Sequence, residues 1–148
     1  MTARLFESTL YAVLLCASCA ASAASPAQSL RIKLQDSSTD PAIAHMRIVI
    51  DHDALKSGRV TFEAQNQSKT LVHEVLIARD VGAGKLPFNA KTDRVIESRV
   101  HRLGEISDLA PGKTGKLTLN LKPGSYLLFC NLPGHYKDGM VTKLTIAP

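Results

Sequence analysis

The stretch KLTLNLKPGSYLLFC, residues 116–130, contains the pattern of two β-strands and the turn between them. Leucine stands at every second position from Leu117 to Leu121, with polar residues between. This period of two is expected of a strand that buries one face. The dipeptide Pro123-Gly124 then gives a turn signal, and a second apolar run follows it. The stretch therefore predicts two consecutive strands of a β-sheet protein.

The same alternation recurs along most of the chain. It is found in LRIKLQD (30–36), MRIVID (46–51), RVTFEAQN (59–66), LVHEVLIA (71–78) and MVTKLTIAP (140–148). Six or seven short strands separated by turn signals are typical of an all-β sandwich or barrel.

No single period holds for long between residues 79 and 115. We expect an irregular insertion around residues 80–115, which contains a short helix near Asp93 to Arg102 or makes an excursion between the sheets. The sequence shows no internal repeat and no later linker, so residues 30–148 are predicted to form one domain.

The N-terminal segment has the features of a secretory signal. An early arginine precedes an apolar run from Leu10 to Ala21, and small residues up to Ala23 fit a cleavage rule. We therefore predict a signal peptide over residues 1–23, a short linker over 24–29 and export to the periplasm. No later stretch has the length of an apolar membrane span.

Two cysteines of the predicted signal leave a second interpretation open. A lipoprotein anchored at Cys19 is conceivable, but Cys16 replaces the leucine expected three positions earlier. Anchoring is therefore the less favoured alternative.

The chain of 148 residues carries a formal charge of +5, and removing residues 1–23 takes away one cation and one anion. The cations are scattered and aromatic residues are few, which argues against nucleic-acid binding. The positive charge favours association with acidic protein partners.

The loop CNLPGHYKDGM, residues 130–140, combines a thiol, an imidazole and a thioether. Cys130, His135 and Met140 are each separated by four residues, with two glycines to bend the loop. After signal removal Cys130 has no disulfide partner, so it is an inert core thiol, an intermolecular cysteine or a metal ligand. Thiolate, imidazole and thioether together favour copper, provided that a second histidine completes the set.

His73 is the candidate for that second histidine. Alternation within LVHEVLIA places it on the apolar face with Val75 and Ile77, where a histidine needs a hydrogen-bond partner or a metal. A hydrogen-bonded core histidine is the alternative. His45, His52 and His101 could each belong to a second metal site, but they lack a convergent pattern and are more typical of solvated surface groups.

In these features the chain resembles the cupredoxins, the small blue-copper proteins, over nearly all of residues 30–148. The loop 130–140 is similar to their C-terminal copper loop, and the layout from Asn66 to His73 is similar to their first ligand segment. The resemblance implies a Greek-key β-sandwich of about seven or eight strands that binds one type 1 copper ion. It implies this ligand set: His73, Cys130 and His135 in the equatorial plane and Met140 in the axial position.

One position departs from the family pattern. Cupredoxins commonly have Asn or Ser after the first ligand histidine, where it helps to tie the two ligand segments together, and this chain has Glu74. Alternation turns the Glu74 side chain away from the His73 face. We expect the backbone N–H groups of Glu74 and Leu132 to donate to the Cys130 sulfur, because Pro133 has no N–H.

The resemblance implies a monomeric periplasmic electron carrier that cycles between Cu(I) and Cu(II), not an enzyme. Its partners would be a cytochrome, oxidase or reductase with an acidic docking surface, reached through an apolar patch at Leu132, Pro133 and His135. The alternative is a copper-binding protein for tolerance, storage or delivery, with copper-handling partners. A sandwich without metal that serves as an interaction module, and a Cys/His hydrolase, are less favoured because the full ligand set is present.

Overall fold

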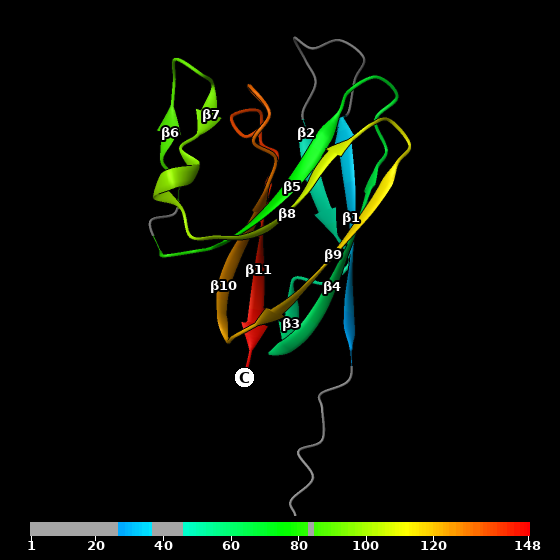
Figure 1. The fold of residues 1–148 in the computed structure, drawn as a ribbon, viewed down its shortest axis with the longest axis vertical. Helices are drawn as coiled ribbons and strands as arrows, with labels where there is room; N and C mark the ends of the chain where they lie inside the picture. Colours follow the sequence, from blue (N-terminus) through cyan, green and yellow to red (C-terminus); the bar gives the residue numbers. More distant parts are fainter. Residues whose placement is uncertain (1–26, 37–45, 83–84) are drawn as a thin grey trace, which may run out of the picture.

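The computed structural model describes residues 27–36, 46–82 and 85–148, which form two facing β-sheets (Figure 1). The first sheet has the strand order β2 (Met46–Ile50), β1 (Gln28–Asp36), β4 (Gly58–Asn66), β9 (Thr114–Leu121). The second has the order β3 (Ala54–Lys56), β11 (Val141–Ala147), β10 (Gly124–Phe129), β5 (His73–Arg79), β8 (Arg102–Leu109). The predicted signal peptide with Cys16 and Cys19, and His45, lie outside the described residues.

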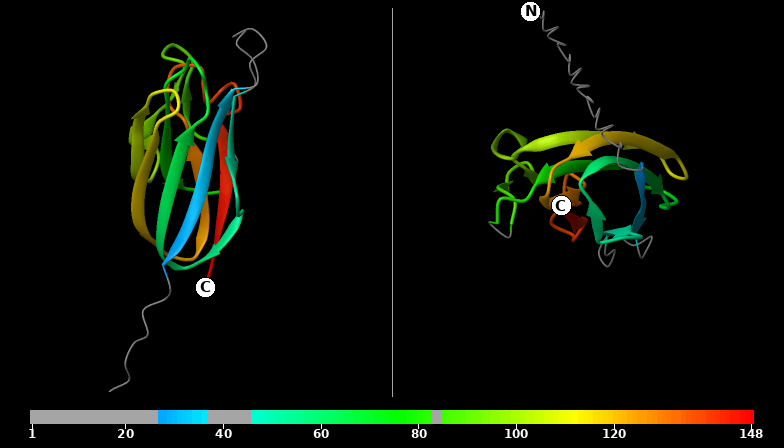
Figure 2. Two further views of the ribbon diagram at one scale, coloured as in Figure 1. Left: turned by 90° about the vertical axis from the view of Figure 1, so that its right-hand side faces the viewer. Right: turned by 90° about the horizontal axis from the view of Figure 1, so that it is seen from below.

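Strands that are neighbours in a sheet are often distant in the sequence. The chain changes sheets at the connections β2–β3, β3–β4, β4–β5, β8–β9 and β9–β10, so that it crosses repeatedly between the two layers, as in Greek-key sandwiches. Most pairs are antiparallel, but β1 with β4 and β3 with β11 are parallel. Seen from below in Figure 2, the strands surround a common interior. The predicted all-β sandwich is therefore confirmed.

The interior is filled by the apolar side chains of the alternating strands. Leu30 of β1 lies opposite Phe62 of β4, and both are fully buried. Val75 and Ile77 reach the same cluster from β5 in the other sheet. Cys130 and Met140 belong to this cluster too, so the two ends of the predicted copper loop are anchored in the main core.

The irregular part of the chain is shorter than the sequence indicates. Residues 80–82 and 85–101 leave the second sheet and contain β6 (Phe88–Asn89), β7 (Arg94–Val95) and the short 3-10 helix η1 (Glu97–Arg99). Figure 1 shows this excursion beside the second sheet, and we call it the side flap. The predicted short helix is thus a single 3-10 turn.

The side flap covers the outer face of β5. Leu76, Ala78 and Phe129 form a second buried cluster with Val95 of the flap. As a result β5 is buried on both faces, and Glu74 on the outer face is only 8% exposed. The described residues contain no helix of the length and hydropathy needed to cross a membrane.

Strand β8 was missed by the sequence pattern because bulges interrupt its alternation. Its register against β5 shifts between His73 and Val75, and again between Ile77 and Ala78. Asp108 near its end has a positive φ of 46°, which few residues other than glycine adopt. The period of two therefore fails where the strand itself continues.

Candidate metal centre

His73 is the first residue of β5, and the turn before it is shaped by polar side chains. The buried Asn66 side chain donates to the carbonyls of Leu71 and Leu109, at 2.8 and 2.7 Å, and accepts from the Ser68 N–H. The Ser68 hydroxyl in turn accepts from the Leu71 N–H. This network fixes the end of the turn, so the His73 ring enters the core from a rigid support.

Cys130 follows the last residue of β10, and the loop after it closes on itself. The Cys130 N–H donates to the Met140 carbonyl at 3.1 Å, and the Met140 N–H donates to the His135 carbonyl at 3.0 Å. Gly134 and Gly139 have φ values of +86° and +98°, which suit glycine. These bonds hold the three residues of the predicted loop together.

The donor atoms of His73, Cys130 and His135 converge. The two Nδ1 atoms lie 3.2 Å apart, and Cys130 Sγ lies 3.3 Å from His135 Nδ1. All three ligand atoms are within 4.8 Å of one another. His73 and Cys130 are fully buried, whereas His135 is half-buried. Cys130 lies 57 positions after His73 in the chain. The fold thus brings these two distant residues together with His135 of the loop.

The protonation states at this point fit a soft metal cation. Burial and the neighbouring His135 lower the pKa of His73 to about 4, and burial also lowers the pKa of His135. Both rings are therefore neutral near pH 7, and two facing Nδ1 atoms can share one proton at most. Burial raises the pKa of Cys130 to about 11, so a thiolate here needs a bound cation.

Nδ1 is the ring nitrogen of His73 that faces the site, 3.2 Å from His135 Nδ1. The Nε2 of the His73 ring is buried and has no hydrogen-bond partner among the described residues. The polar contact of the ring with the described protein is therefore made by Nδ1, at the site. Two imidazole nitrogens and one thiol sulfur form the N₂S donor set that suits copper.

Met140 lies at the closing end of the loop. Its side chain is fully buried in the same cluster as Cys130, and its backbone is hydrogen-bonded to both Cys130 and His135. A thioether is a soft, weak ligand, which is suitable for an axial position.

The expected donors to the Cys130 sulfur are present. The backbone N–H groups of Leu132 and Glu74 both bond to it, and each favours the thiolate form. One donor comes from the loop and the other from β5, so the sulfur is held from both ligand segments.

The Glu74 side chain points away from His73, as alternation predicts, but it is not solvated. Its Oε1 accepts a hydrogen bond from the Asn131 N–H at 3.0 Å. Burial raises the pKa of Glu74. Through this bond the carboxyl group ties the first ligand segment to the residue after Cys130.

Asn131 was not singled out from the sequence. Its buried side chain accepts from the Val95 N–H at 2.6 Å and donates to the Val95 carbonyl and to Glu97 Oε1. Asn131 thus joins the metal loop to the side flap. A polar residue directly after a buried strand end is the signal that could have pointed to it.

The other described histidines are not drawn into the site. His52 is exposed, with its Nδ1 3.1 Å from Asp51 Oδ1, and His101 is exposed at the end of the side flap. In the described part of the chain, His73, Cys130 and His135 form the one group of three or more Cys, His, Asp or Glu residues close enough to share an ion.

Sequence comparison gives two matches. The family model described as "Copper binding proteins, plastocyanin/azurin family" matches residues 52–147. The copper-resistant cuproprotein CopI of Pseudomonas aeruginosa is 49% identical over 39 residues, which are 26% of this chain and 22% of that relative. The match to CopI therefore spans about a fifth of that protein.

Several solved structures share the fold. Reduced auracyanin from Roseiflexus castenholzii is 21% identical and covers 84% of this chain and 99% of its own, with a TM-score of 0.54. Rusticyanin from Thiobacillus ferrooxidans is 16% identical and covers 82% of this chain and 77% of its own, with a TM-score of 0.59. Auracyanin A from Chloroflexus aurantiacus, described as a "blue" copper protein, is 21% identical, covers 82% and 99%, and has a TM-score of 0.57.

Proposed function

Because the chain belongs to the plastocyanin/azurin family of copper-binding proteins, we propose that it is a blue-copper electron carrier. One copper ion would be held by His73 Nδ1, Cys130 Sγ and His135 Nδ1, with Met140 Sδ as a weaker fourth ligand. The observation that carries the proposal is the convergence of two nitrogens and one sulfur within 4.8 Å in a buried site. Bound copper would supply a one-electron couple between Cu(I) and Cu(II).

The surrounding protein supports repeated electron transfer by holding its donors still. His73 is fixed by the Asn66 network, and Cys130 receives backbone hydrogen bonds from two segments. Side chains that cannot rearrange between the two oxidation states keep the cost of reorganisation low. A preformed and rigid site is what a carrier needs.

The proposed route for electrons is the His135 edge of the site. His135 and Leu132 are half-buried and Pro133 is exposed, so an apolar surface adjoins the one ligand that approaches solvent. A small apolar contact suits brief complexes with redox partners. We infer an acidic docking surface on those partners from the charge of +5, and we expect the carrier to act as a monomer outside the cytoplasm and not as an enzyme.

Copper handling is a second candidate, and the 49% identity to a copper-resistant cuproprotein favours it. The same ligands would then store or deliver copper for tolerance. The match covers only 39 residues, so it supports a shared segment more directly than a shared role.

Stopped-flow kinetics can separate the two candidates. We expect the copper-loaded protein to exchange electrons rapidly with an acidic c-type cytochrome, at a rate that falls as salt is added. The matched variant Pro133→Glu, which puts a charge on the apolar edge, should slow the exchange without changing the copper spectrum. Negligible exchange with redox partners, together with marked copper sensitivity of a deletion strain, would favour copper handling instead.

A further inference from the structure

A groove of about 510 Å³ lies between the copper loop and the side flap. The flap contributes Lys85, Leu86 and Phe88, and the loop contributes Tyr136 and Lys137. We call this feature the basic groove. It is separate from the apolar edge formed by Leu132, Pro133 and His135.

The apolar wall of the basic groove is fixed in place. The Tyr136 ring lies 6.0 Å from the Phe88 ring and 6.1 Å from the ring of the buried Phe129. The Leu86 N–H donates to the Tyr136 hydroxyl at 3.0 Å. Beneath the wall lies the second buried cluster, which supports Leu86, Tyr136 and Val141. A rigid aromatic surface loses little entropy when another side chain packs on it.

The rim of the basic groove is cationic. Lys85 and Lys137 are exposed, and the Lys137 side chain is 68% exposed. Asp93 is the nearest acid, with its Oδ1 4.0 Å from Lys137 Nζ. The carboxylates of Asp93 and Asp138 also lie beside Gly134, within 3.9 Å of where its Cβ would be.

We propose that the basic groove binds an acidic segment of a protein partner, with an aromatic or aliphatic side chain of that segment on Phe88 and Tyr136. Carboxylates on either side of this anchor would pair with Lys85 and Lys137. Aromatic anchors in fixed apolar pockets supply much of the energy of small interfaces, and the charges supply orientation and encounter rate.

The position of the groove relates it to the copper site. Tyr136 directly follows His135, and the His135 carbonyl accepts from the Met140 N–H in the same closed loop. A segment held against Tyr136 would therefore sit one residue from a proposed copper ligand. The inference rests on the proposed function, because it describes how a partner is held beside the proposed electron route.

A peptide titration tests the groove directly. The probe is a synthetic peptide with one phenylalanine between two pairs of glutamates, added at low ionic strength to the ¹⁵N-labelled, Cu(I)-loaded protein. We expect shifts at the backbone amides of Leu86, Phe88 and Tyr136. A double variant, Lys85→Glu with Lys137→Glu, should weaken binding by about tenfold or more.

The matched control changes the net charge equally elsewhere. Lys56→Glu with Lys122→Glu alters two exposed lysines on β3 and on the turn before β10, at the opposite end of the sandwich (Figure 1). It should change the affinity by no more than about twofold if the groove lysines act locally. The same peptide with glutamines in place of glutamates should bind weakly.

Three outcomes would overturn the proposal. They are equal weakening by both double variants, shifts that map to Leu132 and His135 alone, and concentration-dependent self-association that blocks the peptide. The copper spectrum of every variant is also recorded, because it distinguishes failure of the groove hypothesis from failure of the copper-site hypothesis. An intact spectrum with no peptide binding rejects the groove, whereas loss of the spectrum in the wild type rejects the copper site.

Discussion

Two side chains at the proposed copper site, His73 and Cys130, are held in forms that favour a soft cation. The low pKa of His73, about 4, keeps its ring neutral, and the raised pKa of Cys130, about 11, keeps the free thiol protonated. Burial of these polar groups costs stability, and a bound metal would offset that cost.

The copper-free protein should lose stability as the pH falls from about 6.5 to about 4, the two pKa values of His73 in the unfolded and folded states. In this window the unfolded chain binds a proton at His73 that the folded chain does not, so the free energy of unfolding decreases. The lowered pKa of His135 acts in the same direction.

Urea unfolding of the copper-free protein at several pH values measures this effect. The His73 contribution should amount to about 3 kcal/mol across the window. His73→Gln, which has no titrating ring, is the matched control and should show a shallower pH dependence. An unchanged dependence in that variant would show that His73 is not buried in a neutral form.

Residue spacing and alternation pointed to the three candidate donors, and the resemblance to the cupredoxins completed the set, but neither indicated the groups behind them. The loop spacing identified Cys130 and His135, and alternation placed His73 on the core face, as the structure confirms. Alternation also turned Glu74 outward, but it could not show that the side flap buries this residue. The Asn131 network depends on the flap in the same way, and a sequence period carries no such long-range information.

At the scale of strands, the regular alternation predicted β1, β2, β4, β5, β9, β10 and β11. The alternation did not predict strand β8, because two register shifts against β5 and the positive φ of Asp108 break its period of two. The side flap has no period of its own, since its short elements are held by contacts with β5 and the copper loop. Tertiary contacts, which local sequence does not encode, determine both features.

The bond between Glu74 and Asn131 gives a prediction about how strand β5 is tied to the copper loop. Glu74→Gln keeps an acceptor for the Asn131 N–H, and because burial disfavours the charged form of Glu74, this variant should be near wild type in stability. Glu74→Ala leaves that buried N–H without a partner and should cost about 1–3 kcal/mol.

Urea unfolding and the reduction potential of the copper-loaded protein measure the two consequences of Glu74→Ala. We expect a lower free energy of unfolding and a shifted potential, because the Glu74 backbone N–H bonds to the Cys130 sulfur. If Glu74→Gln and Glu74→Ala behave alike in both measurements, the hydrogen bond to Asn131 does not position the loop.

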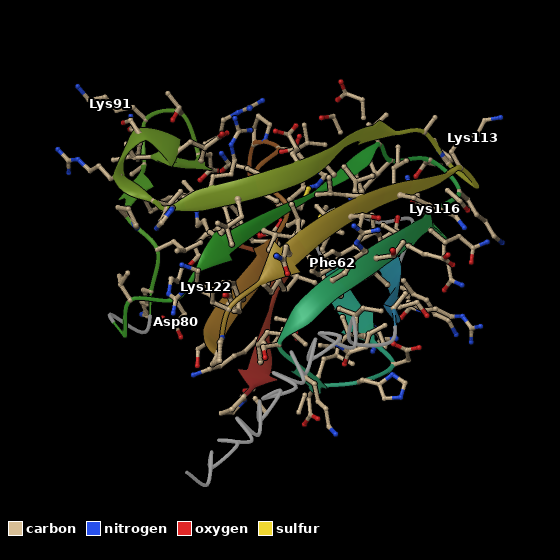
Figure 3. All side chains as sticks on the ribbon, turned by 60° about the horizontal axis from the view of Figure 1, so that its bottom comes forward. Phe62, Asp80, Lys91, Lys113, Lys116 and Lys122 are labelled. Carbon is tan, nitrogen blue, oxygen red and sulfur yellow. The ribbon has the colours of Figure 1, made fainter. Side chains whose placement is uncertain are left out.

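At the scale of the whole molecule, the sandwich carries its site at one end and its charge around its surface. Lys91 and Lys122 lie on one side of the view in Figure 3 and Lys113 and Lys116 on the other, while Phe62 is buried in the interior. Such dispersed charge gives a general attraction to acidic proteins and leaves orientation to local features. The apolar edge at Pro133 and the basic groove at Tyr136 are the local features beside the copper loop.

The visible spectrum during titration of Cu(II) into the purified protein tests the central claim most directly. We expect one ion per chain to produce an intense band from thiolate-to-copper charge transfer, and we expect Cys130→Ser to lack that band although its two histidines remain. A colourless product, or a band of equal strength in Cys130→Ser, would contradict the proposed site.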